Sequence, residues 1–164
     1  MMLLSTISVL VVAISLDSVY GQENTTYSDI PKFFAIQHST SGSISETNST
    51  AYSLELNEIS DKTILFSDRP DRIVKTTSTS DLIGNWSTGV DSFAGDAPNA
   101  VLIVDESENQ DIAIIELFNP LYDSNTKTLK YEINLDNATS IHLPSEFGQA
   151  TLLIDPGGQP GVGG

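Results

Sequence analysis

The feature that most constrains the fold of this chain is a strict alternation of apolar and polar residues in short runs. In residues 129–135 (LKYEINL) every second position is apolar, and residues 52–56 (YSLEL) show the same period. Successive side chains of a β-strand point to opposite faces, so this period is typical of a strand with one buried face. The chain therefore predicts half-buried strands rather than long helices.

Further short apolar runs have the length of strands and are separated by turn-forming residues. They cover residues 33–36, 63–66, 100–104, 111–118 and 150–154. A turn over 123–126 predicts a hairpin before the strand at 129–135. We expect the Ser/Thr-rich residues 38–50 to form a long loop or a hairpin tip, and Pro120 to end the pairing of the strand before it.

One short helix is expected over residues 78–86, capped by Thr79 or Ser80. Its apolar positions Leu82, Ile83 and Trp86 would share one face, so we expect Trp86 with Leu82 to close the core. The pattern as a whole predicts a mainly β fold: a single antiparallel β-sandwich or small barrel with one short helix.

The charge and the cysteine content exclude several classes of function. The 164 residues include 22 acidic and 7 basic side chains, for a net charge of −15, and no cysteine. Such a charge repels nucleic acid and anionic membrane surfaces. Its simplest interpretation is a solvated surface, and the alternative is a site for cations or for a cell-surface component. Without cysteine, thiolate catalysis and cysteine-held zinc or iron–sulfur centres are excluded. No cofactor is expected, and the partner stays unknown.

The first 21 residues resemble an export signal. Residues 3–16 are apolar or small throughout, which suits a signal-peptide core and is short for a spanning helix. Val19 and Gly21 favour cleavage after residue 21. We expect a polar lead-in at 22–31, a β-rich domain at 32–155 and a flexible Gly-rich tail at 156–164. The mature chain would be secreted or extracytoplasmic, and the alternative is an uncleaved N-terminal membrane anchor.

Four Asn-x-Ser/Thr triplets agree with export. They are glycosylation acceptors only in a host that has the machinery. Their asparagines are Asn24, Asn48, Asn85 and Asn137.

Residues 62–75 hold four of the seven basic side chains. Within this stretch Arg69 and Arg72 lie next to Asp68, and the planar guanidinium suits a bidentate clamp on a carboxylate. A structural ion pair is one interpretation, and a small anion site is the other. We expect Arg69 or Arg72 to lie within ion-pair reach of Asp68, Asp91 or Asp96.

A second polar stretch covers residues 91–100. Asp91, Asp96 and Asn99 offer hard oxygen ligands of the kind that calcium takes, but their spacing matches no known calcium loop. Side chains that cap turns through their own backbone are the alternative, and we assign no metal site.

Three stretches together resemble a known family. They are FSDRP with Arg72, SFAGDAPNA, and LFNPLYDSNTKTLKYEI. The chain resembles, over about residues 33–135, a family of small exported prokaryotic proteins of unknown function, which share Phe-Ser-Asp-Arg-Pro and Phe-x-x-Asp-x-Pro-Asn-Ala motifs. The resemblance implies an architecture and no activity.

Three functions follow as hypotheses. The first is a non-enzymatic exported β domain that binds a partner or belongs to the cell surface. The second is a small hydrolase or isomerase that uses Asp68 or Asp96 as a base, with Arg69 or Arg72 holding an anion. The third is a calcium-dependent adhesion-type module. The sequence holds no nucleophile elbow, zinc-protease motif, phosphate loop or EF-hand.

Overall fold

A computed structural model describes residues 31–47, 51–89, 92–106, 109–135 and 143–155. The expected signal segment (1–21), nearly all of the lead-in (22–31) and the Gly-rich tail (156–164) lie outside these residues.

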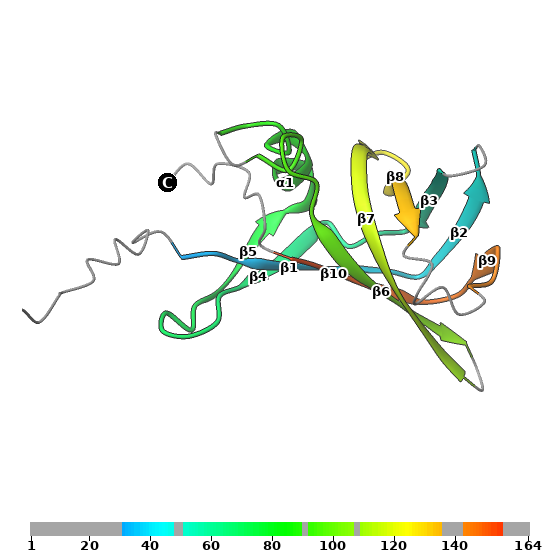
Figure 1. Cartoon of the computed structure of the whole chain (residues 1–164), viewed down its shortest axis with the longest axis horizontal. Helices are drawn as coiled ribbons and strands as arrows, with labels where there is room; N and C mark the ends of the chain where they lie inside the picture. Colours follow the sequence, from blue (N-terminus) through cyan, green and yellow to red (C-terminus); the bar gives the residue numbers. More distant parts are fainter. Residues whose placement is uncertain (1–30, 48–50, 90–91, 107–108, 136–142, 156–164) are drawn as a thin grey trace, which may run out of the picture.

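Within these described ranges, ten strands and one helix follow in chain order (Figure 1). They are β1 (Phe34–Ser39), β2 (Ser41–Glu46), β3 (Tyr52–Asn57), β4 (Lys62–Phe66), β5 (Val74–Ser78), α1 (Thr79–Gly84), β6 (Asn99–Glu106), β7 (Asn109–Asp123), β8 (Thr128–Leu135), β9 (Glu146–Phe147) and β10 (Ala150–Ile154). The predicted mainly β, antiparallel fold with one short helix is confirmed. All the strands belong to one sheet, in the order β5-β4-β1-β10-β6-β7-β8-β3-β2-β9, and this sheet is not closed into a barrel.

The sheet curls around its own inner face. The helix α1 contacts β4 and β5 at one edge and also β7, which lies four strands away from β4 in the sheet, and Figure 1 shows α1 between these two parts. Every second residue of most strands points into the enclosed core. The buried apolar residues of the central strands are Ala35, Leu54, Leu56, Ala100, Leu102, Val104, Ala113, Ile115, Leu117, Leu129, Tyr131, Ile133, Ala150, Leu152 and Ile154.

The long loop or hairpin tip expected over residues 38–50 is wrong for the first two-thirds of this range, and a hairpin connection between β2 and β3 begins only at Thr47. Strand β1 continues to Ser39, and Ser41–Glu46 forms β2, which pairs with β3 on one side and β9 on the other. Gly42 lies directly under the ring of Phe147, so the absence of a side chain lets β9 pack there. The β9 partner lies far away in the sequence, and the local composition carries no sign of it.

The break expected at Pro120 is also wrong. Strand β7 runs from Asn109 to Asp123, and its pairing with β8 shifts register between Phe118 and Leu121. Asn119 adopts a left-handed φ of 45°. Such a bulge accommodates the missing N–H of Pro120 and lets the strand continue.

Strand β5 and the two-residue β9 were not expected from the sequence. Residues 74–78 (VKTTS) are polar and exposed over most of their length, which is typical of an edge strand. The strand exists because it pairs with β4 along all five residues.

The helix is shorter than expected, and its cap differs. Ser78, rather than Thr79 or Ser80, is the N-cap, because its hydroxyl accepts a hydrogen bond from the Asp81 N–H at 2.9 Å. Leu82 and Trp86 are buried, 6 % and 5 % exposed. The prediction that they cover the core is confirmed.

Candidate functional site

The predicted anion or ion-pair residues lie on the hairpin between β4 and β5. Ser67 closes this hairpin: its N–H donates to the Ile73 carbonyl and its hydroxyl accepts from the Ile73 N–H, both at 2.9 Å. Asp68, Arg69 and Arg72 are exposed. Within the described part of the chain, no carboxylate lies within 4.0 Å of either guanidinium. The hairpin therefore presents its two arginines to solvent.

The second predicted loop covers the end of the core near α1. The Phe93 ring packs on Trp86 with 4.7 Å between centroids, and the Gly95 and Asp96 N–H groups donate to the Ser92 carbonyl. The Asp96 side chain is exposed. This geometry is a tight turn held by its own backbone.

The remaining residues of that stretch do not complete a metal site in the structure. Asn99 is the exposed first residue of β6, and Asp91 lies outside the described residues. Among the residues that the structure describes, no three His, Asp or Glu side chains gather as metal ligands would. The structure brings neither Arg69 nor Arg72 within ion-pair distance of Asp68 or Asp96.

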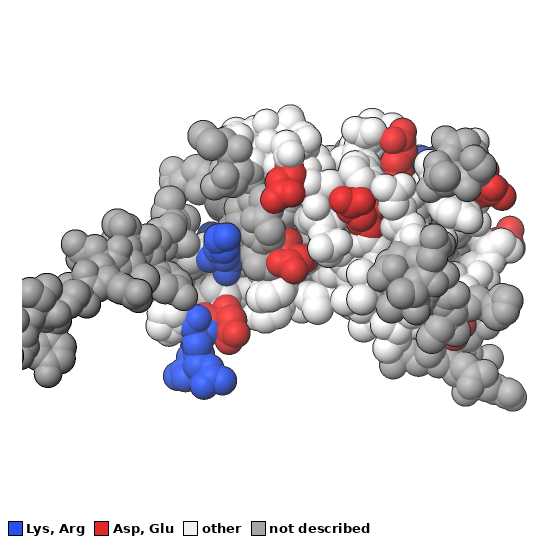
Figure 2. All heavy atoms as spheres, in the orientation of Figure 1, with Lys and Arg blue, Asp and Glu red and all other residues white. Residues whose placement is uncertain are grey.

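The basic side chains fall into two groups. Lys127 and Lys130 form ion pairs with Asp61 and Glu55, at 2.8 Å and 2.7 Å. The other five form no ion pair with any described residue. We call four of them, at the start of β1 and around the β4–β5 hairpin, the cationic end: Lys32, Arg69, Arg72 and Lys75. Figure 2 shows Lys and Arg gathered at this end of the molecule, while most Asp and Glu are spread over the rest of that face.

One member of the cationic end is held by an aromatic ring rather than by an acid. Lys75 Nζ lies 4.2 Å from the centroid of the Phe33 ring. A cation–π contact orients the ammonium without neutralising it, so the positive charge of this end is retained.

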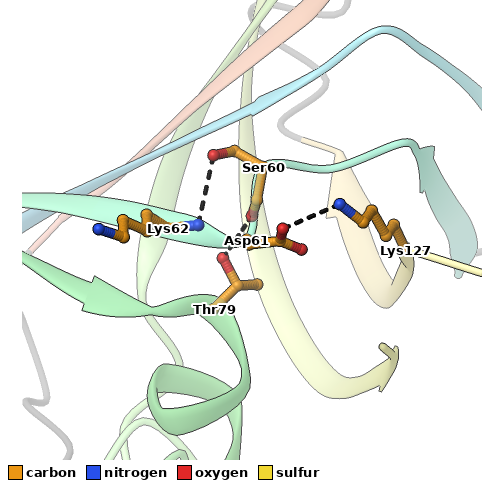
Figure 3. Close-up of polar contacts among 5 residues, drawn as sticks. All are labelled: Ser60, Asp61, Lys62, Thr79 and Lys127. Atoms are coloured by element: carbon orange, nitrogen blue, oxygen red, sulfur yellow. Dashed lines mark hydrogen bonds and ion pairs between the residues drawn. The ribbon is translucent and has the colours of Figure 1, made fainter. Parts of the chain in front are cut away.

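Lys127, which is ion-paired, lies outside the cationic end, in a group of polar contacts that joins three elements of the fold (Figure 3). Hydrogen bonding to Asp61 raises the pKa of the Lys127 ammonium. On the other side of Asp61, the buried Thr79 hydroxyl donates to the Ser60 carbonyl at 2.7 Å and the Thr79 N–H donates to the Asp61 carbonyl. These bonds tie the β7–β8 hairpin to the starts of β4 and α1.

The surface that sequence reasoning missed is the outer side of the sheet. Strand pairing aligns five apolar residues in one row across five neighbouring strands: Ile64 (β4), Ile36 (β1), Leu153 (β10), Val101 (β6) and Ile114 (β7). On one side of this row, Val74, Phe66 and Phe34 are aligned across β5, β4 and β1. On the other side, Ile103 is paired with Ile112.

We call these ten side chains the outer apolar face: Phe34, Ile36, Ile64, Phe66, Val74, Val101, Ile103, Ile112, Ile114 and Leu153. None belongs to the core cluster, which is built from the alternate residues of the same strands. Val74 is 74 % exposed, Ile64 and Ile112 are 44 % exposed and Ile114 is 40 % exposed. The Phe34 and Phe66 rings stack on this face with 5.0 Å between centroids.

The sequence did carry a sign of this surface. Residues 100–104 are apolar at all five positions, whereas a strand with one solvent-exposed face alternates apolar and polar residues. A run that is apolar on both sides needs a cover on both sides. Among the described residues, the core covers one side only.

The structure describes one of the four predicted glycosylation acceptors. Asn85 is exposed, directly after α1. The other three acceptors (Asn24, Asn48 and Asn137) lie outside the described residues. In the described ranges no helix is long and apolar enough to cross a bilayer.

Comparison with known proteins adds no relative. No family model, no curated protein and no solved structure matches this chain.

Proposed function

We propose that this chain is a non-enzymatic exported β domain that acts by binding, at the cell surface or outside the cell. The outer apolar face is its binding surface. The observation that carries the proposal is the uninterrupted apolar row from Ile64 to Ile114, across five strands, on the side of the sheet away from the core.

Large contiguous apolar patches are rare on monomeric soluble proteins and mark interaction sites. The inner face supplies the core without any of these ten residues. Apolar residues on the water side of a sheet also invite aggregation. Their presence on six adjacent strands is best accounted for by a contact that covers them.

Two features of the sequence support export. The apolar run at 3–16, followed by Val19 and Gly21, fits a cleavable signal. The four Asn-x-Ser/Thr triplets agree with export, as glycosylation acceptors in a host that has the machinery.

Hydroxyl-radical footprinting tests the proposal, by comparing the native protein on intact cells with the purified full chain in dilute solution. Ile64, Val74, Ile112 and Ile114 should be labelled in dilute solution and protected on cells. Leu121 is 70 % exposed and lies outside the face, so it serves as an internal control with equal labelling in both samples. Equal labelling of the face itself in both samples would refute binding through this surface.

A further inference from the structure

We infer that the occupant of the outer apolar face is a second copy of this chain, packed face to face in a two-fold dimer with β5 of one copy over β7 of the other. The inference rests on the proposed function, since it names the partner of that same surface. Two apolar sheets commonly pack at about 10 Å from each other.

The first support is the charge at the two ends of the face. At the β5 side the face borders the cationic end, whose four basic side chains outnumber the two exposed carboxylates of the same hairpin, Asp68 and Asp71. Its Arg69 and Arg72 form no ion pair with described residues. At the β7 side it borders Glu116 and Glu132, which accept hydrogen bonds from asparagines and form no ion pair with described residues. The face thus carries a positive and a negative end.

This polarity makes the face complementary to itself. A two-fold axis that lies between the copies, parallel to the central strands, places the β5 side of one copy over the β7 side of its partner. Each cationic end then meets Glu116 of the partner subunit. The other two-fold arrangement, with β5 over β5, brings like charges together, and like-charge contacts disfavour a complex.

Two other occupants fit the polarity less well. The apolar run at residues 3–16 of the same chain contains no charged residue and would leave both charged ends unmatched. An anionic membrane surface would be repelled by a chain with a net charge of −15. A second copy supplies both an apolar surface and the reversed polarity.

Sedimentation velocity of the full chain over a concentration series tests the dimer. Wild type should form a dimer, and Ile114→Asp should raise its dissociation constant at least about tenfold, because it buries a charge in the interface. Leu121→Asp is the matched control: it makes the same kind of change on the same strand, outside the face, and should leave the dimer intact. Ile64→Asp, on β4, repeats the test on another strand. Near-ultraviolet circular dichroism from Trp86 shows that each variant is folded.

Glu116→Lys tests the orientation. It lowers the negative charge of the chain, so general repulsion alone predicts tighter association. The β5-over-β7 arrangement predicts the opposite, because the new lysine faces the cationic end of the partner. Tighter association of Glu116→Lys would overturn this arrangement.

The remaining outcomes separate this inference from the proposed function. A wild-type chain that is monomeric at every concentration, with a face that is protected on cells, would overturn the dimer and leave the binding function standing with another partner. A dimer that is indifferent to Ile114→Asp and Ile64→Asp would show association through another segment, and would also overturn the inference.

Discussion

The Tyr131 hydroxyl on β8 donates a hydrogen bond to Gln37 Oε1 on β1, with 3.0 Å between the oxygens, across the interior of the curled sheet. The two strands are four positions apart in the sheet, and both side chains are buried. Burial raises the pKa of the Tyr131 hydroxyl, which keeps it protonated as a donor. Gln37 Nε2, by contrast, has no hydrogen-bond partner among the described residues.

Tyr131→Phe should therefore lower the free energy of unfolding by about 1–3 kcal/mol, because Gln37 loses its last described side-chain partner in a buried site. Adding Gln37→Met should recover most of that loss, since a flexible apolar side chain replaces two unsatisfied polar atoms. Urea denaturation followed by Trp86 fluorescence measures both, because the Trp86 and Tyr131 rings are in contact. A double variant less stable than Tyr131→Phe would contradict this account.

Gly42→Ala should destabilise the domain by about 1–3 kcal/mol through overpacking. A Cβ at this position would lie 2.5 Å from a Phe147 ring carbon and 2.6 Å from the Glu55 carbonyl oxygen. Gly84→Ala is the matched control, because a Cβ there meets nothing within 4 Å. Alanine in place of this helical glycine should stabilise by up to about 1 kcal/mol. Thermal melts of the two variants should shift in opposite directions, and a shared direction would refute the packing argument at β9.

The Asp123 carboxylate should make the free energy of unfolding depend on pH in the acidic range. The Asn125 N–H donates to its carboxylate at 2.9 Å and holds the pKa of Asp123 below its ordinary value of 3.8. A lowered folded-state pKa stabilises the fold above pH 3.8, and this stabilisation is lost as the pH falls through the folded-state value. Wild type should thus be more stable than Asp123→Asn near neutral pH, with the difference shrinking in acid. Urea midpoints across a pH series measure it, and a difference that stays constant with pH would count against the carboxylate.

Sodium chloride should raise the melting temperature. A net charge of −15 repels itself, and salt shortens the Debye length from about 10 Å at 0.1 M to about 3 Å at 1 M. Calcium at matched ionic strength should add little. A specific calcium site would instead add about 2.7 kcal/mol at a hundredfold excess over Kd. A melt that is flat or falling with sodium chloride would rule out the self-repulsion, and a calcium-only rise would favour the calcium-dependent module.

Sequence reasoning located strands wherever the pattern was local. The alternation in 129–135 and 52–56 placed β8 and β3, and the side that it marked as apolar is the buried side. The helix was found as well, because a capping hydroxyl and an apolar face lie within nine residues, although Ser78 rather than Thr79 or Ser80 is the cap. On the candidate site, the sequence identified the β4–β5 hairpin by its concentration of arginines but did not show whether acids neutralise them.

Only the tertiary structure decided which runs pair and which faces stay open. The polar residues of β2 and β5 form strands because β3 and β4 offer hydrogen-bonding edges to them. The run at 100–104 is apolar on both faces of the strand. Only its pairing register with β10 and β7 places Leu102 in the core and Val101 on the outer face. Periodicity is a property of neighbouring residues, so the sequence alone determined the strands whose apolar and polar residues alternate. Exposure depends on what lies next to a side chain in space, and for β6 that includes β10, which lies far away in the chain.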